Sequence, residues 1–102
     1  MDIKKTIDNH KIWVATERSK GKRANFKGKD LSAKDLSGEK LDGAMFKGTD
    51  MQMVNLSFGS FKNANFENAD LTGADLTGSD LSGANLKGAV LDGANLTDTV
   101  MV

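Results

Sequence analysis

The sequence predicts an all-β solenoid whose N-terminal end is covered by a short α-helix. A large apolar residue recurs at every fifth position from Phe26 to Met101, without a break in phase. A small residue stands two positions before each large residue from Ala64 onward, and glycine fills nine of the fifteen positions two residues after it. A fixed period of five is neither the 3.6 of a helix nor the 2.0 of a strand, and a short internal repeat is typical of solenoids.

The N-terminal segment lacks the repeat and predicts a helix over residues 3–18. Ile3, Ile7 and Val14 lie on one helical stripe, and charged residues cover the rest of the surface. Gly21 suits the exit from such a helix. Because the terminal coil of a solenoid exposes apolar core, we expect this helix to lie over the first coil. The predicted domains are a cap and linker over residues 1–23 and a solenoid over residues 24–102.

Two residues of the predicted cap have alternative roles. Trp13 lies beside the apolar stripe and is interpreted either as a plug over the open end of the core or as an anchor for a partner. His10, the single histidine, is interpreted either as a helix-surface or hydrogen-bonding residue of the cap or as a ligand or base. The first interpretation is favoured for both residues.

Each repeat combines an extended piece with a turn. In the unit Ala69-Asp-Leu-Thr-Gly73, residues two apart in an extended chain point the same way, so Ala and Leu face inward together. The order Leu-Thr-Gly-Ala fits a type II turn, with glycine where a positive φ is needed. Asn63, Asn68 and Asp98 tolerate that conformation, whereas Ala33, Met53 and Phe58 do not favour it. At these last three corners we expect another type of turn.

Four units of five close a four-sided coil of twenty residues, and about four coils at the ~4.8 Å spacing of paired strands would stand about 19 Å tall. Every twentieth residue should therefore stack in an inner pillar. The four predicted pillars are Phe26, Phe46, Phe66 and Leu86; Leu31, Met51, Leu71 and Leu91; Leu36, Leu56, Leu76 and Leu96; and Leu41, Phe61, Leu81 and Met101. Stacked aromatic rings in the first pillar would favour this arrangement.

The run ANFENADLTGADLTGSDLSGANLKGAVLDGANL resembles the pentapeptide-repeat family, whose consensus is A-[DN]-L-x-x. The resemblance extends over residues 24–102 and implies a right-handed quadrilateral β-helix. Lys29, Lys34 and Glu39 depart from the consensus, because they occupy the inward position that is normally small. We therefore expect the first coil to be less regular than the others.

The residue types argue against catalysis. The chain has no cysteine for a thiol nucleophile or a thiolate metal site, and one histidine cannot make a two-histidine metal motif. Serine and threonine occur at repeat spacing as turn residues, and the glycines form no phosphate-binding motif. The sequence predicts no enzyme, no catalytic residues, no cofactor and no bound metal. It also contains no apolar run of the ~18–20 residues that a membrane-spanning helix needs.

The neutral net charge hides an asymmetry. Residues 1–23 carry seven basic and three acidic side chains, whereas residues 24–102 carry seven basic and eleven acidic ones. The neutral total argues against direct nucleic-acid binding. Asp30, Asp50 and Asp70 should stack in one outward acidic stripe. Some members of the family resemble duplex DNA and bind type II topoisomerases, so a DNA-mimicking binder of gyrase is the alternative function.

Two sets of apolar residues are candidate interfaces. Near the C-terminus, Val90, Val100, Met101 and Val102 leave the last coil without a cap, which predicts either end-to-end self-association or an end that frays into solvent. In the second coil, Met53 and Phe58 stand where polar residues or glycine are expected, so they form either a contact site or, with Phe58 tucked inward, a widened corner. We therefore expect a non-catalytic, cytoplasmic, bacterial or phage-encoded module that binds a protein partner or itself and no membrane.

Overall fold

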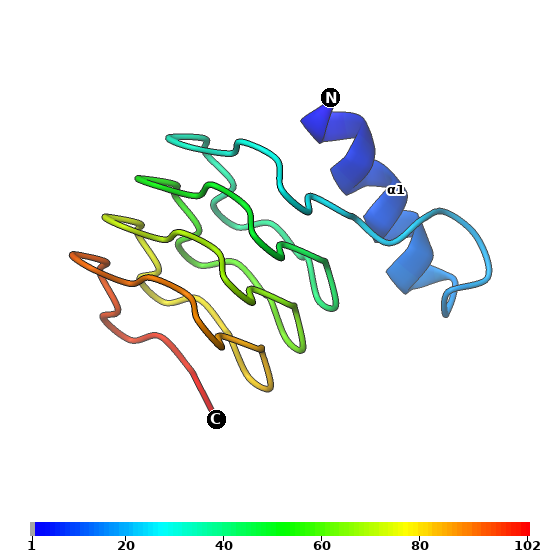
Figure 1. Ribbon diagram of the computed structural model, residues 1–102. Coiled ribbons are helices and arrows are strands. Elements are labelled where there is room, and N and C mark those ends of the chain that lie inside the picture. The colour runs from blue at the N-terminus through cyan, green and yellow to red at the C-terminus, as the bar shows by residue number, and fades with distance from the viewer. Residues whose placement is uncertain (1) are drawn as a thin grey trace.

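The computed structural model, which describes residues 2–102, shows one helix at the end of a stack of four-sided coils (Figure 1). Helix α1 (Ile3–Ala15) begins where the Asp2 carboxylate accepts the backbone N–H of Lys5 at 3.0 Å. It ends three residues earlier than predicted, because Glu17 and Arg18 adopt positive φ angles of 53° and 72° that no α-helix continues. The domain boundary after residue 23 stays a prediction.

A turn follows every large inward residue. The carbonyl of Phe26 accepts the N–H of Lys29 at 2.9 Å, and the same bond recurs every five residues up to Leu96 and Thr99 at 3.1 Å. The third residue of each turn has a positive φ at all fifteen corners from Gly28 to Asp98. We number the four sides by their residues in the first coil: side 1 is residues 24–28, side 2 is 29–33, side 3 is 34–38 and side 4 is 39–43. Each side recurs every twenty residues.

The expectation of a different turn at three corners is wrong. Ala33, Met53 and Phe58 have φ angles of 57°, 59° and 57°, the same as their glycine counterparts. Their corner N–H groups are fixed by the next coil, as in the bond from Phe58 to the Thr77 carbonyl at 2.8 Å. The ladder thus imposes the left-handed conformation whatever the side chain, at a cost of about 1–2 kcal/mol for each non-glycine residue.

Successive coils pair through twelve parallel bridges, each joining residues twenty apart, from Asn25–Met45 to Asp80–Val100. The Phe26 N–H donates to the Met45 carbonyl at 2.8 Å, and the Met45 N–H donates to the Ala24 carbonyl at 2.9 Å. Each side contributes one bridge between successive coils, so the extended pieces are too short to be numbered as strands. The architecture is a β-helix with its core inside the four walls.

The predicted pillar residues line the interior, and those up to Leu81 are at most 3% exposed. The Phe46 ring stacks on Phe26 and Phe66, with ring centroids 5.3 and 4.8 Å apart, and Phe61 meets Phe46 edge-on at 6.2 Å. Gly59 makes room for Phe61, because a Cβ there would lie 2.6 Å from its ring. Toward the C-terminus Leu86 and Leu91 are half-buried, whereas Leu96 and Met101 are 39% and 46% exposed.

The first coil follows the same path as the others, contrary to the expectation from its three charged inward positions. The turn bonds from Lys34 to Leu31 and from Glu39 to Leu36 are kept, at 3.2 and 3.3 Å. Lys29 and Lys34 are exposed, and Glu39 lies 3.6 Å from the Lys11 ammonium on α1. A charged residue is tolerated at this position because no coil lies above it.

Helix α1 packs on the first coil through Ile3, Ile7 and His10 rather than through the predicted stripe that included Val14, which is 47% exposed. The Trp13 indole lies beside the Gly43 corner. The guanidinium groups of Arg18 and Arg23 lie 5.0 and 4.7 Å from the indole centroid, as in cation–π pairs. Trp13 is half-buried at this corner, and its role as a plug over the open end of the core stays a prediction.

His10 connects the helix to the first coil through two hydrogen bonds. Its side chain is fully buried, its Nδ1 accepts the Ala24 N–H at 2.9 Å, and its Nε2 lies 2.8 Å from the Asp42 carbonyl oxygen. Since Nδ1 accepts, the proton of the neutral ring belongs on Nε2, which donates to Asp42. Protonation of Nδ1 would remove the acceptor of Ala24. Burial lowers the pKa of His10 below its ordinary value of 6.5, and the Asp42 carbonyl opposes this only in part.

We expect the free energy of unfolding to decrease as the pH falls below about 6.5. The unfolded chain binds the His10 proton first, so the folded state loses stability from that pH down to the lowered folded pKa and no further below it. Aspartates whose pKa is lowered from 3.8 in the folded chain, such as Asp30 and Asp70, contribute only at lower pH. Urea unfolding between about pH 8 and 5, followed by the fluorescence of Trp13, measures the slope. In His10→Gln this slope should vanish, and an unchanged slope would contradict the role of His10.

Candidate functional site

The described chain offers little for catalysis. Within residues 2–102, no three His, Cys, Asp or Glu side chains are grouped so that they could hold a metal ion. Both ring nitrogens of His10 are occupied by backbone groups. Helix α1, with thirteen residues, is too short to cross a membrane, and no other helix is present between residues 2 and 102.

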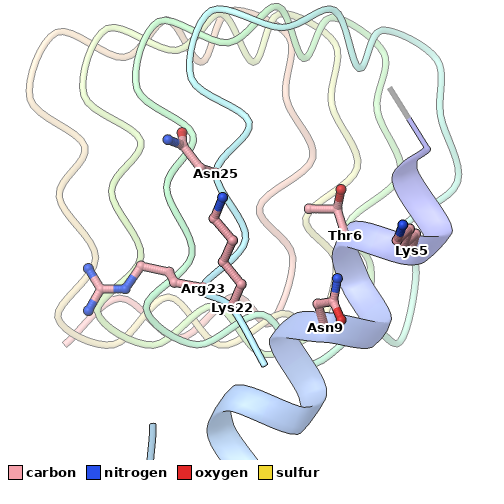
Figure 2. A pocket seen from close by; sticks show the side chains of 6 residues that line it. All are labelled: Lys5, Thr6, Asn9, Lys22, Arg23 and Asn25. Atoms are coloured by element: carbon pink, nitrogen blue, oxygen red, sulfur yellow. The ribbon is translucent and has the colours of Figure 1, made fainter. Parts of the chain in front are cut away.

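A groove of about 250 Å³ runs between α1 and the start of the first coil (Figure 2). Its lining residues are Lys5, Thr6, Asn9, Lys22, Arg23 and Asn25. They provide cationic and amide groups without a carboxylate, but the Arg23 guanidinium stacks on Trp13 and none of the six residues is buried. An open groove between exposed side chains lacks the enclosed walls of a ligand pocket.

The structure stacks the three aspartates of the acidic stripe, since bridges join Asp30 to Asp50 and Asp50 to Asp70. Each carboxylate is also bound within its own turn. Asp30 accepts the N–H of Ser32 at 2.9 Å and its hydroxyl at 2.6 Å, and Asp70 holds Thr72 in the same way at 3.1 and 2.6 Å. These hydrogen bonds hold the pKa of Asp30 and Asp70 below the ordinary 3.8. Asp30 and Asp70 thus stabilise their turns and stay ionised at neutral pH.

This Asx turn is the general outward motif of the β-helix. Eleven outward Asp or Asn side chains accept the N–H of the residue two positions later: Asn25, Asp30, Asp35, Asp50, Asn55, Asn65, Asp70, Asp75, Asp80, Asn85 and Asn95. On side 4, where Ser60 takes this place, the Asp42 carboxylate of the preceding coil accepts the Lys62 N–H at 2.9 Å instead. Asp and Asn are therefore interchangeable for the turn and differ in charge.

The charge is distributed unequally over the four sides. Sides 2 and 3, which adjoin along one edge, carry seven carboxylates: Asp30, Asp35, Asp50, Asp70, Asp75, Asp92 and Asp98. Their two lysines, Lys29 and Lys34, lie at the end next to α1. Sides 1 and 4 carry five lysines and four carboxylates, with ion pairs at 3.6 Å (Lys47–Glu67) and 3.7 Å (Lys62–Asp80). The acidic surface is thus wider than the predicted stripe.

Met53 and Phe58 are 66% and 72% exposed, so the structure excludes the alternative in which Phe58 tucks inward. Met53 stands at the corner between sides 2 and 3, and Phe58 at the corner between sides 3 and 4. Each lies against a glycine of the next coil: the Met53 sulfur is next to Gly73, and a Cβ at Gly78 would lie 2.6 Å from the Phe58 ring. Both side chains are therefore held at fixed places on the surface while remaining largely open to solvent.

Asparagine fills the equivalent place elsewhere. The Oδ1 atoms of Asn63 and Asn68 lie over Gly83 and Gly88, as the Phe58 ring lies over Gly78. Asparagine tolerates a positive φ, whereas a bulky residue there is an outlier. Met53 and Phe58 thus combine backbone strain with exposed apolar area, two features that stability alone would not select.

The last coil also exposes apolar residues. Val90, Val100, Met101 and Val102 are 41%, 43%, 46% and 91% exposed. In this coil the N–H groups of Leu86, Leu91 and Leu96 have no backbone acceptor within residues 2–102, whereas their equivalents one coil earlier all bond to the next coil. Within residues 2–102, this face thus combines apolar side chains with backbone donors that have no acceptor.

Known proteins identify the class of this fold. Residues 60–98 match the family model described as pentapeptide repeats, with eight copies. The structure resembles that of a pentapeptide repeat protein from Nostoc Pcc 7120, with a TM-score of 0.75 and 27% identity over 90% of this chain and 71% of that one. No protein with a curated description matches the sequence. The repeats and the β-helix together define the class: residues 60–98 carry pentapeptide repeats, and the chain is similar to pentapeptide-repeat proteins in sequence and fold.

Two further structures support this assignment. A pentapeptide repeat protein from the Arabidopsis thaliana thylakoid lumen has a TM-score of 0.70 and 38% identity, covering 76% of this chain and 57% of that one. Rfr23, from the cyanobacterium Cyanothece 51142, has a TM-score of 0.62 and 31% identity, covering 82% and 60%. This chain therefore spans less than two thirds of the length of both.

Sequence reasoning missed several parts of this surface. It did not foresee that Gly73 and Gly78 support the two exposed apolar side chains, or that Asp35, Asp75 and their neighbours extend the acidic stripe onto side 3. Both features follow from the twenty-residue register. Sorting the charges by side and pairing each corner residue with the one twenty positions later would have found them.

Replacing both exposed corner residues by asparagine should leave the fold intact and keep or increase its stability. The substitution relieves strain of about 1–2 kcal/mol per corner, which offsets the loss of partly exposed apolar contacts. We expect the urea midpoint of Met53→Asn/Phe58→Asn to be equal to or above that of the wild type. The buried Phe46→Ala is the contrast and should lose about 3–5 kcal/mol. A comparable loss in the corner variant would show that Met53 and Phe58 serve packing.

Proposed function

We propose that this chain is a non-catalytic protein-binding module that presents a rigid β-helix surface. We take the β-helix as right-handed and about four coils long. The observation that carries the proposal is the exposure of Met53 and Phe58 at corners whose left-handed backbone favours asparagine or glycine. Exposed apolar residues that cost stability are typical of contact sites. A cytoplasmic location and a bacterial or phage origin stay predictions.

The scaffold supports binding because it fixes the surface in advance. Every corner is tied within its coil, and the twelve corners from Gly28 to Gly83 are also bonded to the next coil, so side chains on these walls lose little backbone freedom when a partner docks. Pre-organisation of this kind lowers the entropic cost of association. The small polar residues of the walls leave a flat surface on which a few large side chains determine the contact.

The last coil supports a second mode of binding, in which two copies associate through this face. Leu96 and Met101 are pillar residues that are 39% and 46% exposed, and the N–H groups of Leu86 and Leu91, which have no backbone acceptor within residues 2–102, form a β edge. A second chain that covers this face would bury the ends of the pillars. Backbone pairing along the edge would add hydrogen bonds to this burial.

The alternative of a DNA-mimicking gyrase binder gains no specific support. Duplex DNA carries about one negative charge per 1.7 Å of axis, or about eleven over the ~19 Å of four coils. Sides 2 and 3 carry seven carboxylates, and five lysines interrupt the negative charge on sides 1 and 4. The charge distribution is that of a molecule with one acidic surface rather than of a uniformly charged rod.

The partner-binding proposal is tested by capture with matched variants. Immobilised wild type, Met53→Asn/Phe58→Asn and a control, Asn63→Ala, are incubated with lysate of the source organism. We expect one identified protein to bind the wild type and the control. Its binding to the double variant should be weaker by at least about tenfold. The purified protein should show the same difference. Equal binding of that protein to all three would contradict a role for these corners.

Self-association is tested by light scattering coupled to size-exclusion chromatography. We expect the 102-residue chain to show a mass above 10.9 kDa that increases with concentration, and Met101→Lys/Val102→Lys to be a monomer. The control Met53→Asn/Phe58→Asn should associate like the wild type, because its changes lie away from the last coil. A wild-type monomer at high micromolar concentration would overturn this mode of binding.

A further inference from the structure

We propose that the partner docks as a basic protein segment with an apolar anchor residue on the surface of sides 2 and 3, around Met53 and Phe58. This inference rests on the proposed protein-binding function and adds the chemistry of the partner. The unequal charge of the four sides specifies that chemistry, and the two exposed corner residues specify the place.

Charge complementarity selects a cationic partner. Seven carboxylates lie on the two adjoining sides, and the only cations there, Lys29 and Lys34, stand in the first coil. Around Met53 the carboxylates of Asp50 and Asp70 therefore have no lysine or arginine within ion-pairing distance in the described chain. A phosphate-bearing ligand, whether nucleic acid or lipid, would meet repulsion here, whereas lysines and arginines of a partner would pair with these groups.

The floor between the two anchors is low and polar. Side 3 of the second coil carries Asn55 and Ser57 between Met53 and Phe58. Ser57 is only 7% exposed, and both its N–H and its hydroxyl are held by Asn55 at 2.9 and 2.6 Å. This floor has no long side chain, and the Ser57 donors are paired with the Asn55 Oδ1. A segment can therefore lie across it and place an apolar residue against Met53 or Phe58 without desolvating unpaired donors of Ser57, while the Asn55 amide nitrogen can donate to the segment.

The two apolar anchors and the aspartates around them would contribute to the affinity for such a segment in different ways. Apolar burial at Met53 and Phe58 provides a salt-independent part of the binding, and the aspartates of sides 2 and 3 provide a part that salt screens. A methionine, leucine or aromatic anchor residue can pack against both Met53 and Phe58, because thioethers and aromatic rings make favourable contacts with each other. The proposal thus predicts two separable components of affinity.

Three labelled peptides of about fifteen residues test this by fluorescence anisotropy with the full chain at about 50 and 300 mM salt. The first carries lysines and arginines around a Leu-Phe anchor, the second replaces the basic residues by glutamate, and the third replaces the anchor by serine. We expect the first to bind at least about tenfold more tightly than either of the others. High salt should weaken the binding of the first peptide, which should still bind more tightly than the peptide whose anchor is replaced by serine.

Matched variants place the binding on the structure. Asp50→Asn/Asp70→Asn keeps the turn acceptors, as Asn25 and Asn55 do, and removes only charge. We expect it to weaken the basic peptide and reduce its salt dependence, whereas Asp80→Asn on side 4 should have a smaller effect. Met53→Asn/Phe58→Asn should abolish the difference between the anchored and the serine peptides.

Equal binding of the acidic peptide, or equal effects of the side 2 and side 4 variants, would overturn the inference. Absence of binding by all three peptides would do the same. The proposed function fails separately, through the capture experiment. If Met53→Asn/Phe58→Asn loses an identified partner that lacks a basic segment, then protein binding stands and the cationic chemistry is wrong.

Discussion

The backbone register of twenty residues is the constraint on which the rest of this structure depends. Each coil donates and accepts hydrogen bonds at the same places as the one before it, as between Phe26 and Met45. Side chains at equivalent positions of successive coils then stack, so one inward phenylalanine lies over another. Because the ladder satisfies the polar backbone and aligns the apolar side chains at once, the core and the walls follow from one repeating geometry.

The same constraint explains how unfavourable residues persist at the corners. A loop of ordinary structure would relax to relieve a phenylalanine with a φ of 57°. Here the Phe58 N–H donates to the Thr77 carbonyl of the next coil, and the bond from the Gly59 N–H to the Leu56 carbonyl closes the turn around it. The strain is spread over a cooperative ladder and costs only a fraction of the total stability. A rigid solenoid can thus place large apolar groups in solvent, where a flexible loop would fold them inward.

How far the sequence predicts this molecule depends on which residues follow the period. The pillars, the corner glycines and the stacked aspartates follow from counting, because the fold repeats what the sequence repeats. The cap does not repeat, and there the prediction was weaker: the helix ends at Ala15, and His10 rather than Val14 packs on the core. A polar ring in a buried position is explained only by the two backbone groups it meets, and those belong to distant parts of the chain.

The turns at Ala33, Met53 and Phe58 show a further limit. Local preference indicated another conformation at these corners, yet the next coil overrides it, since conformational preferences of about 1–2 kcal/mol are small against a ladder that bonds on every side. This failure of local reasoning points to the surface features that the repeat does not explain. Where a regular scaffold keeps a residue that its own geometry disfavours, and that residue is both exposed and held in place, the cause that we propose is a partner that contacts the surface. Met53 and Phe58 meet all three conditions, and the aspartates around them limit what such a partner can be.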